Sequence, residues 1–394
     1  MDGKTNKVVS KGGLWLAFEV AALWFTTHVG GGFALGTQEV QYFVRFGASA
    51  FFFPLITMAI LATVFYFSWE FQRVFQTPDY VSFIRTLFAP LSTLWMAFYD
   101  IAFSITVVLA AGATLAGFGT ALSGFLGGIT VPLWVGYLIG AVIVYLLASF
   151  GLKVVLRSSA YMSFGIIGVI IFLVLFRLPQ ITSHLSSVPM ENVLAPSFFK
   201  SATWYMLAYA GFQVCSIGAY VNGGAILKTH KQTVMAGIFG FLLNGGMLIA
   251  MILVLAGNYP AILKDAGPTL TVVHEMSPIF SILYHLMLLF ALITTAVSMI
   301  YSTAKRWATA SKKWAKEGGR WSDDTFRLKV WTIIWIVLTW AVSNLGLVTI
   351  VKKGYGTLAY LGIAILILPI LIVAPRKIAQ KNTENAKLAG ARSQ

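Results

Sequence analysis

Apolar residues in this chain are gathered into long uncharged runs, and polar and charged residues fall in the short segments between them. Most runs are long enough for an α-helix to cross the hydrocarbon core of a bilayer, which takes about 20 residues. Glycines and a proline in "GTALSGFLGGITVP" predict a loop that divides one longer run. We therefore predict ten membrane-spanning helices, at residues 13–46, 49–70, 91–119, 130–150, 154–177, 200–226, 232–256, 277–304, 330–350 and 355–375.

Composition supports an all-α integral membrane protein. Of the 394 residues, 58% are hydrophobic and 10% are charged, and the mean hydropathy is +0.82. A soluble domain of this size has no way to bury so much apolar surface. A single cysteine, Cys215, excludes an intramolecular disulfide and a cysteine metal cluster. The first residues, "MDGKTNKVVSKGG", contain no small-residue cleavage site, so we expect no cleaved signal peptide.

Basic residues predict the orientation of the spans. With the N-terminus inside, 22 of the 28 Lys and Arg residues fall in cytoplasmic segments and six in external ones. This bias favours both termini in the cytoplasm. It also makes "KRWATASKKWAKEGGRW" a cytoplasmic anchor beside anionic lipid rather than a nucleic-acid site. An even number of spans with both ends inside allows two halves of five helices in opposite orientation.

The expected organisation follows from these boundaries. It consists of a cytoplasmic N-terminus (1–12), a first five-helix repeat (13–178), an extracellular loop (179–199), a second five-helix repeat (200–375) and a basic, disordered cytoplasmic tail (376–394).

Two of the predicted helices contain glycine-rich interruptions. The first span holds "THVGGGFALG" (27–36), and the sixth, which opens the second half, holds "LAYAGFQVCSIG" (207–218). Each glycine costs about 1 kcal/mol of helix propensity relative to alanine. Broken helices survive in a bilayer where they line an enclosed polar cavity, and breaks at matching places in two halves are typical of a transporter binding site. The alternative is that the glycines only allow close helix packing.

These residues also carry a family resemblance. The "VGGG" at 29–32 resembles the first-helix break of the amino acid–polyamine–organocation superfamily and of its sodium-coupled relatives with the LeuT-like fold. The "LAYAGFQ" at 207–213 is similar to the sixth-helix motif of that superfamily, although Gln213 stands where an acid is usual. In the eighth span, "ALITT" (291–295) resembles the alanine and hydroxyl pair of a sodium site. The chain looks most like bacterial amino-acid permeases whose substrates are poorly defined.

The resemblance implies a LeuT-like fold in which the first and sixth helices are broken. Exposed peptide groups and half-helix dipoles would then bind a zwitterion. The substrate-binding residues expected at the two breaks are Thr27, His28, Gly30, Gly31, Gly32, Ala208, Tyr209, Gly211, Phe212 and Gln213. Of these, His28 can also titrate near neutral pH. Tyr209 is expected to close over the substrate, or else to pack as an ordinary core aromatic.

The same resemblance implies a sodium ion held by five oxygens. They are the carbonyls of Thr26, Val29 and Ala291 and the hydroxyls of Thr294 and Thr295. The alternative for the two hydroxyls is a hydrogen bond back to their own helix. The fifth span carries no lysine in its interior to replace the ion, which favours sodium over a fixed charge and leaves proton coupling open.

Asp100 is the acid closest to the predicted middle of the membrane, about 15 Å along the third span. A carboxylate there costs several kcal/mol unless it is paired, protonated or in contact with water. It is therefore a candidate to bind the substrate amino group or a coupling proton, and its alternative role is that of a protonated structural acid.

Five further residues are candidates for gating or proton transfer. Glu19 lies at the cytoplasmic depth of Lys153 and Arg157, where an ion pair would act as an inner gate or as a static link. Glu39 is expected to line the outer vestibule. His285 in the eighth span is either a proton site or a satisfied polar residue.

These residues together favour a secondary active transporter that moves a small amino acid or related amine across the plasma membrane by alternating access. Sodium is the expected coupling ion, with the proton as the alternative, and no other cofactor is expected. Catalytic motifs are absent from the sequence, so we expect no enzyme. A monomer or loose dimer in contact with lipid is expected, without nucleic acid. The alternative function is a membrane-embedded sensor of the same fold that binds a solute without transporting it.

Overall fold

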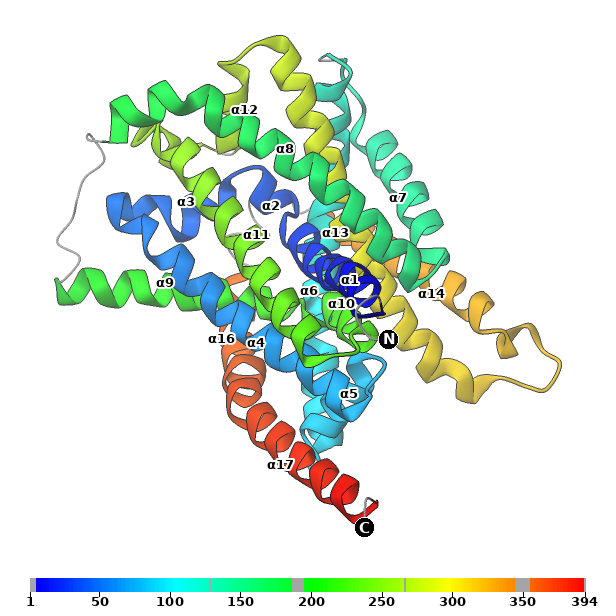
Figure 1. Ribbon diagram of the computed structural model, residues 1–394. Helices are drawn as coiled ribbons and strands as arrows, with labels where there is room; N and C mark the ends of the chain where they lie inside the picture. The colour runs from blue at the N-terminus through cyan, green and yellow to red at the C-terminus, as the bar shows by residue number, and fades with distance from the viewer. Residues whose placement is uncertain (1–4, 128, 186–194, 266, 344–354, 393–394) are drawn as a thin grey trace.

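The computed structural model describes residues 5–127, 129–185, 195–265, 267–343 and 355–392, and every regular element in those ranges is a helix (Figure 1). The helices of the first half are α1 (Thr5–His28), α2 (Gly31–Ala34), α3 (Thr37–Tyr42), η1 (Val44–Phe51), α4 (Phe53–Phe75), α5 (Tyr80–Leu87), α6 (Ser92–Phe125), α7 (Leu133–Ser149) and α8 (Leu152–Leu185). Those of the second half are α9 (Pro196–Val214), α10 (Ile217–Tyr220), η2 (Val221–Ile226), α11 (His230–Ala256), η3 (Ala261–Lys264), α12 (Pro268–His274), α13 (Pro278–Ala310), η4 (Ser311–Trp314), η5 (Arg320–Ser322), α14 (Asp324–Ser343), α16 (Tyr355–Gly362), η7 (Ile363–Ile367) and α17 (Leu368–Arg392).

Seven helices of the described chain are long and apolar enough to cross a membrane, and they make this a multi-pass membrane protein. They lie at Phe53–Phe75, Ser92–Phe125, Leu152–Ser183, His230–Ala256, Pro278–Trp314, Asp324–Val342 and Tyr355–Leu388. Large apolar side chains on the outer helices are exposed, as contact with lipid requires. Ile101 of α6, for example, is 59% exposed and Leu138 of α7 is 56% exposed.

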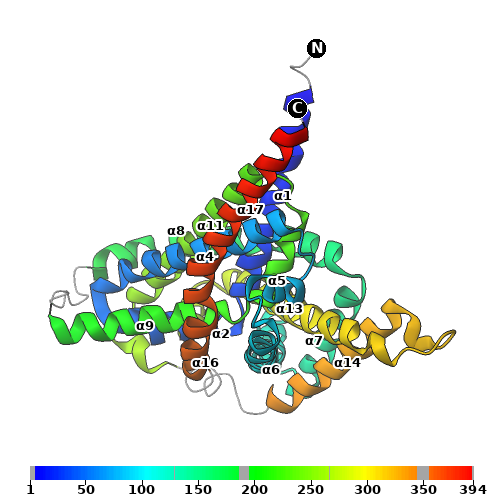
Figure 2. The same cartoon turned by 90° about the horizontal axis from the view of Figure 1, so that it is seen from below.

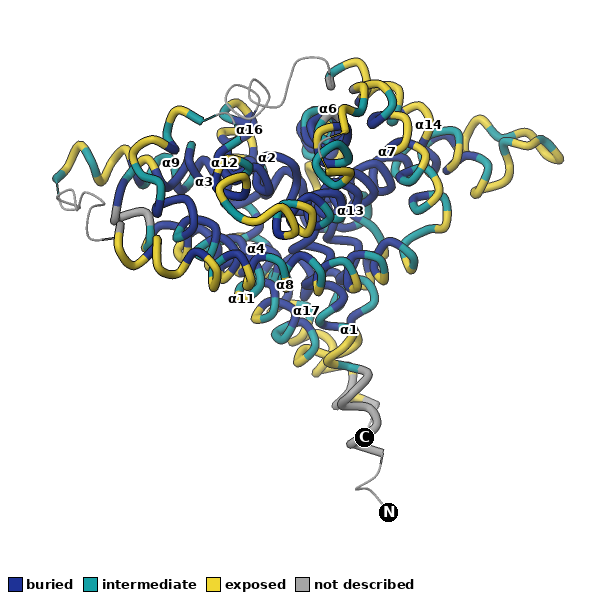
Figure 3. The backbone as a smooth tube through the Cα atoms, turned by 90° about the horizontal axis from the view of Figure 1, so that it is seen from above, coloured by how far each residue is buried: buried dark blue, intermediate teal, exposed yellow. Residues whose placement is uncertain are grey.

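The two glycine-rich segments form the centre of the molecule. Residues 19–40 and 208–224 are buried without exception, and in Figure 3 the dark blue of buried chain fills the middle of the bundle. The helix α1 packs against α8, α11 and α13, while α9 packs against α4 and α16. Their backbone is therefore enclosed by protein, which is the condition under which a broken helix is tolerated at membrane depth.

The third predicted span continues as helix for longer than expected. It was predicted to end at residue 119, but α6 runs to Phe125, and the connection to α7 is shorter than the predicted loop. Two glycines of this stretch, Gly119 and Gly124, serve packing, while Gly127, at φ 72°, lies in the turn after α6. A methyl group on Gly136 of α7 would overlap the backbone of Gly119, and one on Gly124 would overlap the ring of His285 on α13. Glycine at these places lets two helices approach closely and does not end the helix.

Other helices also extend beyond the ends predicted for them. The tail was predicted to be disordered, but α17 continues as helix to Arg392, with an ion pair of 3.3 Å between Lys381 and Glu384 one turn apart. The basic loop is shortened because α13 extends to Ala310 and α14 begins at Asp324. Of the expected loop 179–199, residues 186–194 lie outside the described residues, as do residues 344–350 of the ninth predicted span.

The start of α1 and the end of α17 lie at the same end of the molecule (Figure 2).

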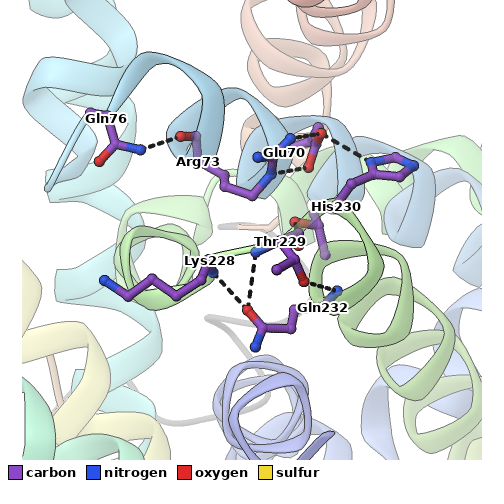
Figure 4. A network of polar contacts seen from close by, with 8 residues as sticks. Glu70, Arg73, Gln76, Lys228, Thr229, His230 and Gln232 are labelled. Atoms are coloured by element: carbon purple, nitrogen blue, oxygen red, sulfur yellow. Dashed lines mark hydrogen bonds and ion pairs between the residues drawn. The ribbon is translucent and has the colours of Figure 1, made fainter. Parts of the chain in front are cut away.

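A polar network connects α4 to α11 (Figure 4). The Glu70 carboxylate accepts hydrogen bonds from Arg73, at 2.9 Å from Nε, and lies 3.0 Å from Nδ1 of His230. Next to it, Thr229 caps α11, and its side chain accepts from the backbone of Gln232. Sequence reasoning did not identify this link, because its partners are far apart in the chain.

Candidate functional site

The first break lies between α1 and α2. The helix α1 ends at His28, the chain is extended at Gly30, and α2 begins at Gly31. Ending the helix frees carbonyls in its last turn. Hydroxyls of α13 satisfy two of them. The Thr294 hydroxyl donates to the Thr26 carbonyl at 3.1 Å, and the Thr295 hydroxyl lies 3.0 Å from the same oxygen. Thr295 also reaches the carbonyl of Thr27, at 3.1 Å.

The second break lies near the end of the predicted segment 207–218. The binding residues expected at it begin at Ala208, but α9 runs unbroken to Val214, and the helix is interrupted at Cys215 and Ser216. Gly211 packs instead, since a methyl group on it would overlap the carbonyl of Ala359 on α16. The packing interpretation was therefore the right one for this glycine.

The break itself is stabilised from α6. The backbone N–H of Gly218, freed where α9 gives way to α10, donates to the Tyr99 hydroxyl at 2.6 Å. The carbonyl of Gln213 accepts from the hydroxyl of Tyr220 at 2.7 Å. Buried backbone groups released by the interruption thus find side-chain partners, as they must away from water.

A small cavity of about 20 Å³ lies between the two breaks. It has room for about one water molecule. No lining residue is formally charged at neutral pH; the lining is small, hydroxylic, amide and aromatic. It consists of Thr27, His28, Gly30, Gly31, Gly32, Gln38, Thr106, Ala110, Thr114, Phe212, Gln213, Ser216, Thr295, Met299, Tyr355 and Leu358.

Many of the expected binding residues meet in this cavity. They are Thr27, His28, Gly30, Gly31, Gly32, Phe212 and Gln213, joined by Thr295 from the expected cation site. Four others do not line it. Tyr209 and Gly211 are buried but do not line the cavity, and Ala208 lines a separate and more open pocket. Asp100 lines neither of the two pockets.

Sequence reasoning missed the face of α6 that completes the cavity. Thr106, Ala110 and Thr114 recur every fourth residue and therefore lie on one side of the helix. A small and hydroxylic stripe of this kind inside an apolar span was a signal that could have been found. The Thr106 and Thr114 hydroxyls donate to carbonyls of their own helix at 2.7 and 2.8 Å, which leaves their oxygens free to accept.

His28 is held rigidly at the end of α1. Its Nδ1 lies 2.6 Å from Oδ1 of Asn244, and its Nε2 lies 2.6 Å from the Tyr209 hydroxyl. The amide nitrogen of Asn244 donates to the carbonyl of Gly240 at 2.8 Å, so the amide oxygen faces the ring. In the neutral ring Nδ1 then carries the hydrogen and Nε2 accepts from Tyr209. Tyr209, which was expected to close over the substrate or else to pack as a core aromatic, is completely buried and contacts His28.

The expected cation ligands come together beside the first break. The Thr294 oxygen lies 3.1 Å from the carbonyl oxygens of both Thr26 and Ala291. With Thr295, four of the five expected oxygens form one cluster. The Thr294 oxygen also lies 2.9 Å from the carbonyl oxygen of Phe290 in its own helix, which is the alternative acceptor for its single hydrogen. Within the described ranges no three His, Cys, Asp or Glu side chains are placed to share a metal ion.

Asp100 is paired instead of facing the cavity. Arg306 binds it through two nitrogens, with Nη2 2.6 Å from Oδ2 and Nε 3.1 Å from Oδ1. The Tyr80 hydroxyl donates to Oδ1 at 3.4 Å. Burial and then the charge of Asp100 hold the pKa of Tyr80 well above its ordinary value, so that this hydroxyl keeps its proton. Arg306 was expected in a loop, but it belongs to the extended end of α13.

Replacing Asp100 by Asn is therefore expected to reduce stability, not to remove a substrate contact. The Arg306 side chain is only 14% exposed, and the substitution leaves it without its counter-ion. We expect a loss of roughly 1–3 kcal/mol, measured as a lower Tm of the detergent-purified protein. Adding Arg306→Gln should recover part of that loss, because no buried charge then remains unpaired. Additive losses in the double variant would contradict this assignment.

The proposed inner gate does not form in this structure. The Oε1 atom of Glu19 accepts a hydrogen bond of 2.8 Å from the indole of Trp15. The ion pairs of the described chain do not join Glu19 to Lys153 or Arg157, which are both exposed. Aromatic rings make the contact between α1 and α8 instead, with Trp15 stacked 6.4 Å from Phe164.

The remaining two candidates, His285 and Glu39, differ in whether their polar atoms have hydrogen-bond partners. His285 lies 2.7 Å from the carbonyl of Ser281 through its Nδ1, and its ring fills the space left by Gly124. It is a satisfied polar residue. Glu39, on α3, is completely buried, and both of its carboxyl oxygens have no hydrogen-bond partner in the described structure.

Comparison with solved structures identifies the fold of the chain. No family model matches the sequence, and no curated protein does. The structure of MhsT in complex with L-phenylalanine has a TM-score of 0.63 at 14% identity, over 93% of this chain and 98% of that one. A Na⁺-coupled sialic acid symporter in its substrate-bound outward-open state has a TM-score of 0.62 at 12% identity, over 90% of this chain and 79% of that one. The chain has a LeuT-like fold.

A third LeuT-like structure is Mhp1, a nucleobase-cation-symport-1 family transporter, in a closed conformation with bromovinylhydantoin bound. It has a TM-score of 0.57 at 14% identity, over 92% of each chain. The LeuT-like fold implied by the resemblance is therefore confirmed. The three neighbours bind an amino acid, a sialic acid and a hydantoin, so the LeuT-like fold itself does not select among small-molecule substrates.

Proposed function

We propose that this protein is a secondary active transporter that moves a small amino acid or related amine across the plasma membrane by alternating access. One observation carries the proposal. Two interrupted segments, both entirely buried, enclose a polar cavity between them at the centre of the molecule. A cavity at such a place is where transporters of this architecture bind their substrates. Its size fits a closed state, which must open before a solute can enter.

The chemistry of the lining supports a zwitterion. Gly31 and Gly32 line the cavity without side chains, so a substrate carboxylate can approach their backbone N–H groups. Across the cavity, the Thr106 and Thr114 oxygens remain free to accept from an ammonium group. A neutral lining of this kind offers no counter-ion for a substrate with net charge, which favours a molecule whose own charges cancel.

Sodium is the proposed coupling ion. The cluster of Thr26, Ala291, Thr294 and Thr295 offers neutral carbonyl and hydroxyl oxygens, which replace the hydration shell of a hard monovalent cation. The cluster joins α1 to α13, so an ion bound there would stabilise one packing of these helices over another. No carboxylate is needed at such a site.

The proposed topology has ten spans in two inverted halves, α1–α8 and α9–α17, with both termini in the cytoplasm. The uneven distribution of Lys and Arg supports this orientation. The start of α1 and the end of α17 lie at one end of the molecule, which agrees with it (Figure 2). No enzymatic activity is proposed.

A binding screen followed by flux measurements tests the function. We expect that some member of a panel of amino acids and amines raises the Tm by several degrees in sodium and not in choline. The same compound should enter sodium-driven proteoliposomes. Ala110→Leu, which fills the cavity, should abolish both effects, and Ile101→Leu on the exposed face of the same helix should abolish neither. Binding without flux would support a sensor, and the absence of both would contradict the proposal.

A further inference from the structure

Glu39 is the least satisfied acid in the described structure. Its exposed fraction is 0%, and neither carboxyl oxygen has a hydrogen-bond partner. An ionised carboxylate without a partner away from water costs several kcal/mol, so the group is stable in this conformation only when it is protonated. Even a neutral carboxyl group is costly to bury unpaired. An acid kept in such surroundings without a structural bond indicates a role that needs it to change its charge.

No cation in the described part of the chain forms an ion pair with Glu39. Its own segment carries Tyr42 and, in η1, Arg45, whose guanidinium donates to the Tyr205 hydroxyl at 3.2 Å. In η3, Lys264 is exposed, and none of the ion pairs of the described chain includes Glu39. The helix α2 has no titratable side chain, and those of α11 are at its far end. Around Glu39, the titratable or charged groups are Tyr42 and Arg45 on its own segment, the exposed Lys200 with Tyr205 and Tyr209 on α9, Lys264 and Asp265 at η3, and Tyr284 on α13.

The position of Glu39 couples it to the cavity. Gln38, its neighbour on α3, lines the cavity, and the Tyr209 hydroxyl lies 3.5 Å from the Gln38 amide oxygen. That same hydroxyl lies 2.6 Å from His28. Both Tyr209 and Tyr284 are within electrostatic reach of the Glu39 carboxyl group. A charge on Glu39 would therefore act on the residues that shape the closed site.

A glycine turn joins α3 to α2. This turn has Gly36 at φ 78°, a conformation that glycine adopts without strain. A side chain at Gly36 would also meet the Thr269 hydroxyl at 2.5 Å, so the turn fits closely against α12. The six-residue α3 is the outer part of the first broken segment in the proposed topology. Separation of α3 from its neighbours would bring Glu39 into contact with outer water.

We propose that Glu39 binds a proton as a second coupling ion, in addition to the cation at α1 and α13, and that the outer side closes only when this carboxyl group is protonated. The inference rests on the proposed transport function. When α3 is open, a proton from outer water adds to one carboxylate oxygen and gives a neutral acid, with no other bond changed. The neutral side chain can then be buried as the structure shows. Closure and transport therefore become faster as the outer pH falls.

Infrared difference spectroscopy on the purified protein tests the protonation directly. After a step from acidic to alkaline pH, the wild type should lose a band of a protonated carboxylic acid that Glu39→Gln lacks throughout. The matched control is Glu384→Gln, which removes one exposed acid on α17 and should keep the band. If wild type and Glu39→Gln give the same difference spectrum at every pH, no proton is held at Glu39 and the inference is wrong.

Proteoliposomes test the coupling, with a radiolabelled mixture of the common amino acids as the probe. Wild-type uptake should increase as the outer pH falls and should depend on sodium. Glu39→Gln should lose the pH response while keeping sodium dependence and exchange, and Glu39→Asp should regain it. A full pH response in Glu39→Gln would overturn the inference and leave the transport proposal intact. If the wild type moves none of the mixture, the transport proposal fails and the inference fails with it.

Discussion

Substitution of both Thr294 and Thr295 by Ala is expected to abolish the response of the protein to sodium. The two hydroxyls supply half of the oxygen cluster beside the first break, and both reach the carbonyl of Thr26. Without them only carbonyl oxygens remain, which are too few to replace the hydration shell of the ion. The measurement is the sodium dependence of both the Tm and the uptake of a transported amino acid. Both should become equal in sodium and in choline.

Two control variants separate this effect from a general loss of stability. Thr303→Ala removes a buried hydroxyl two turns further along α13, whose bond is to the carbonyl of Met299 in its own helix. It should keep the sodium response. Replacement of Thr294 and Thr295 by Ser keeps the oxygens and should restore the response. A sodium effect that survives in the double alanine variant would exclude this cluster as the ion site.

Substitution of Gly211 by Val is expected to prevent correct folding. A side chain there meets the backbone of Ala359, and on the facing helix Gly362 lies just as closely against the carbonyl of Gly211. Neither contact is with a flexible side-chain end, so α9 and α16 would have to separate. We expect a loss of roughly 3 kcal/mol or more, seen as little monodisperse protein after purification.

The matched control for this prediction is Gly168→Ala on α8, where an added methyl group meets nothing within 4 Å. This change should leave the yield unchanged or raise the Tm slightly, because alanine favours the helix. If Gly211→Val purifies as well as Gly168→Ala, then α9 and α16 do not pack as closely as described.

The helical membrane architecture could be predicted because the bilayer imposes it. A span needs about 20 apolar residues whatever the partner helices are, and the helices lie near the predicted runs. The first break could also be predicted, since three adjacent glycines, Gly30 to Gly32, leave little helix propensity. Helix ends were less predictable. Glycines such as Gly119 and Gly124 look like loop residues in the sequence, but their close contacts keep them helical.

The second break shows why one sequence signal was ambiguous. Gly211 allows either an interruption or a close helix contact, and only the position of Ala359 decides between the two. The interruption falls instead at Cys215 and Ser216, neither of which is a strong helix breaker. It is held there by long-range bonds, such as the one from Gly218 to Tyr99.

Partners distant in the sequence account for the other differences. Asp100 was a reasonable binding candidate from its depth alone, because its partner Arg306 is 206 residues away. The hydroxyls of Thr294 and Thr295 could be placed near the break by resemblance. In contrast, the unpaired state of Glu39 follows from the packing of several helices and has no counterpart in a single sequence pattern.

The most direct test of alternating access at this cavity is the labelling of a cysteine placed in its wall. Cys215 is the only cysteine of the chain, so Cys215→Ala gives a cysteine-free background. In that background, Ala110→Cys on the α6 face of the cavity should react with a membrane-impermeant maleimide added from either side of the membrane, and a transported amino acid should slow both reactions. Labelling from one side only, or labelling that no amino acid slows, would contradict the account.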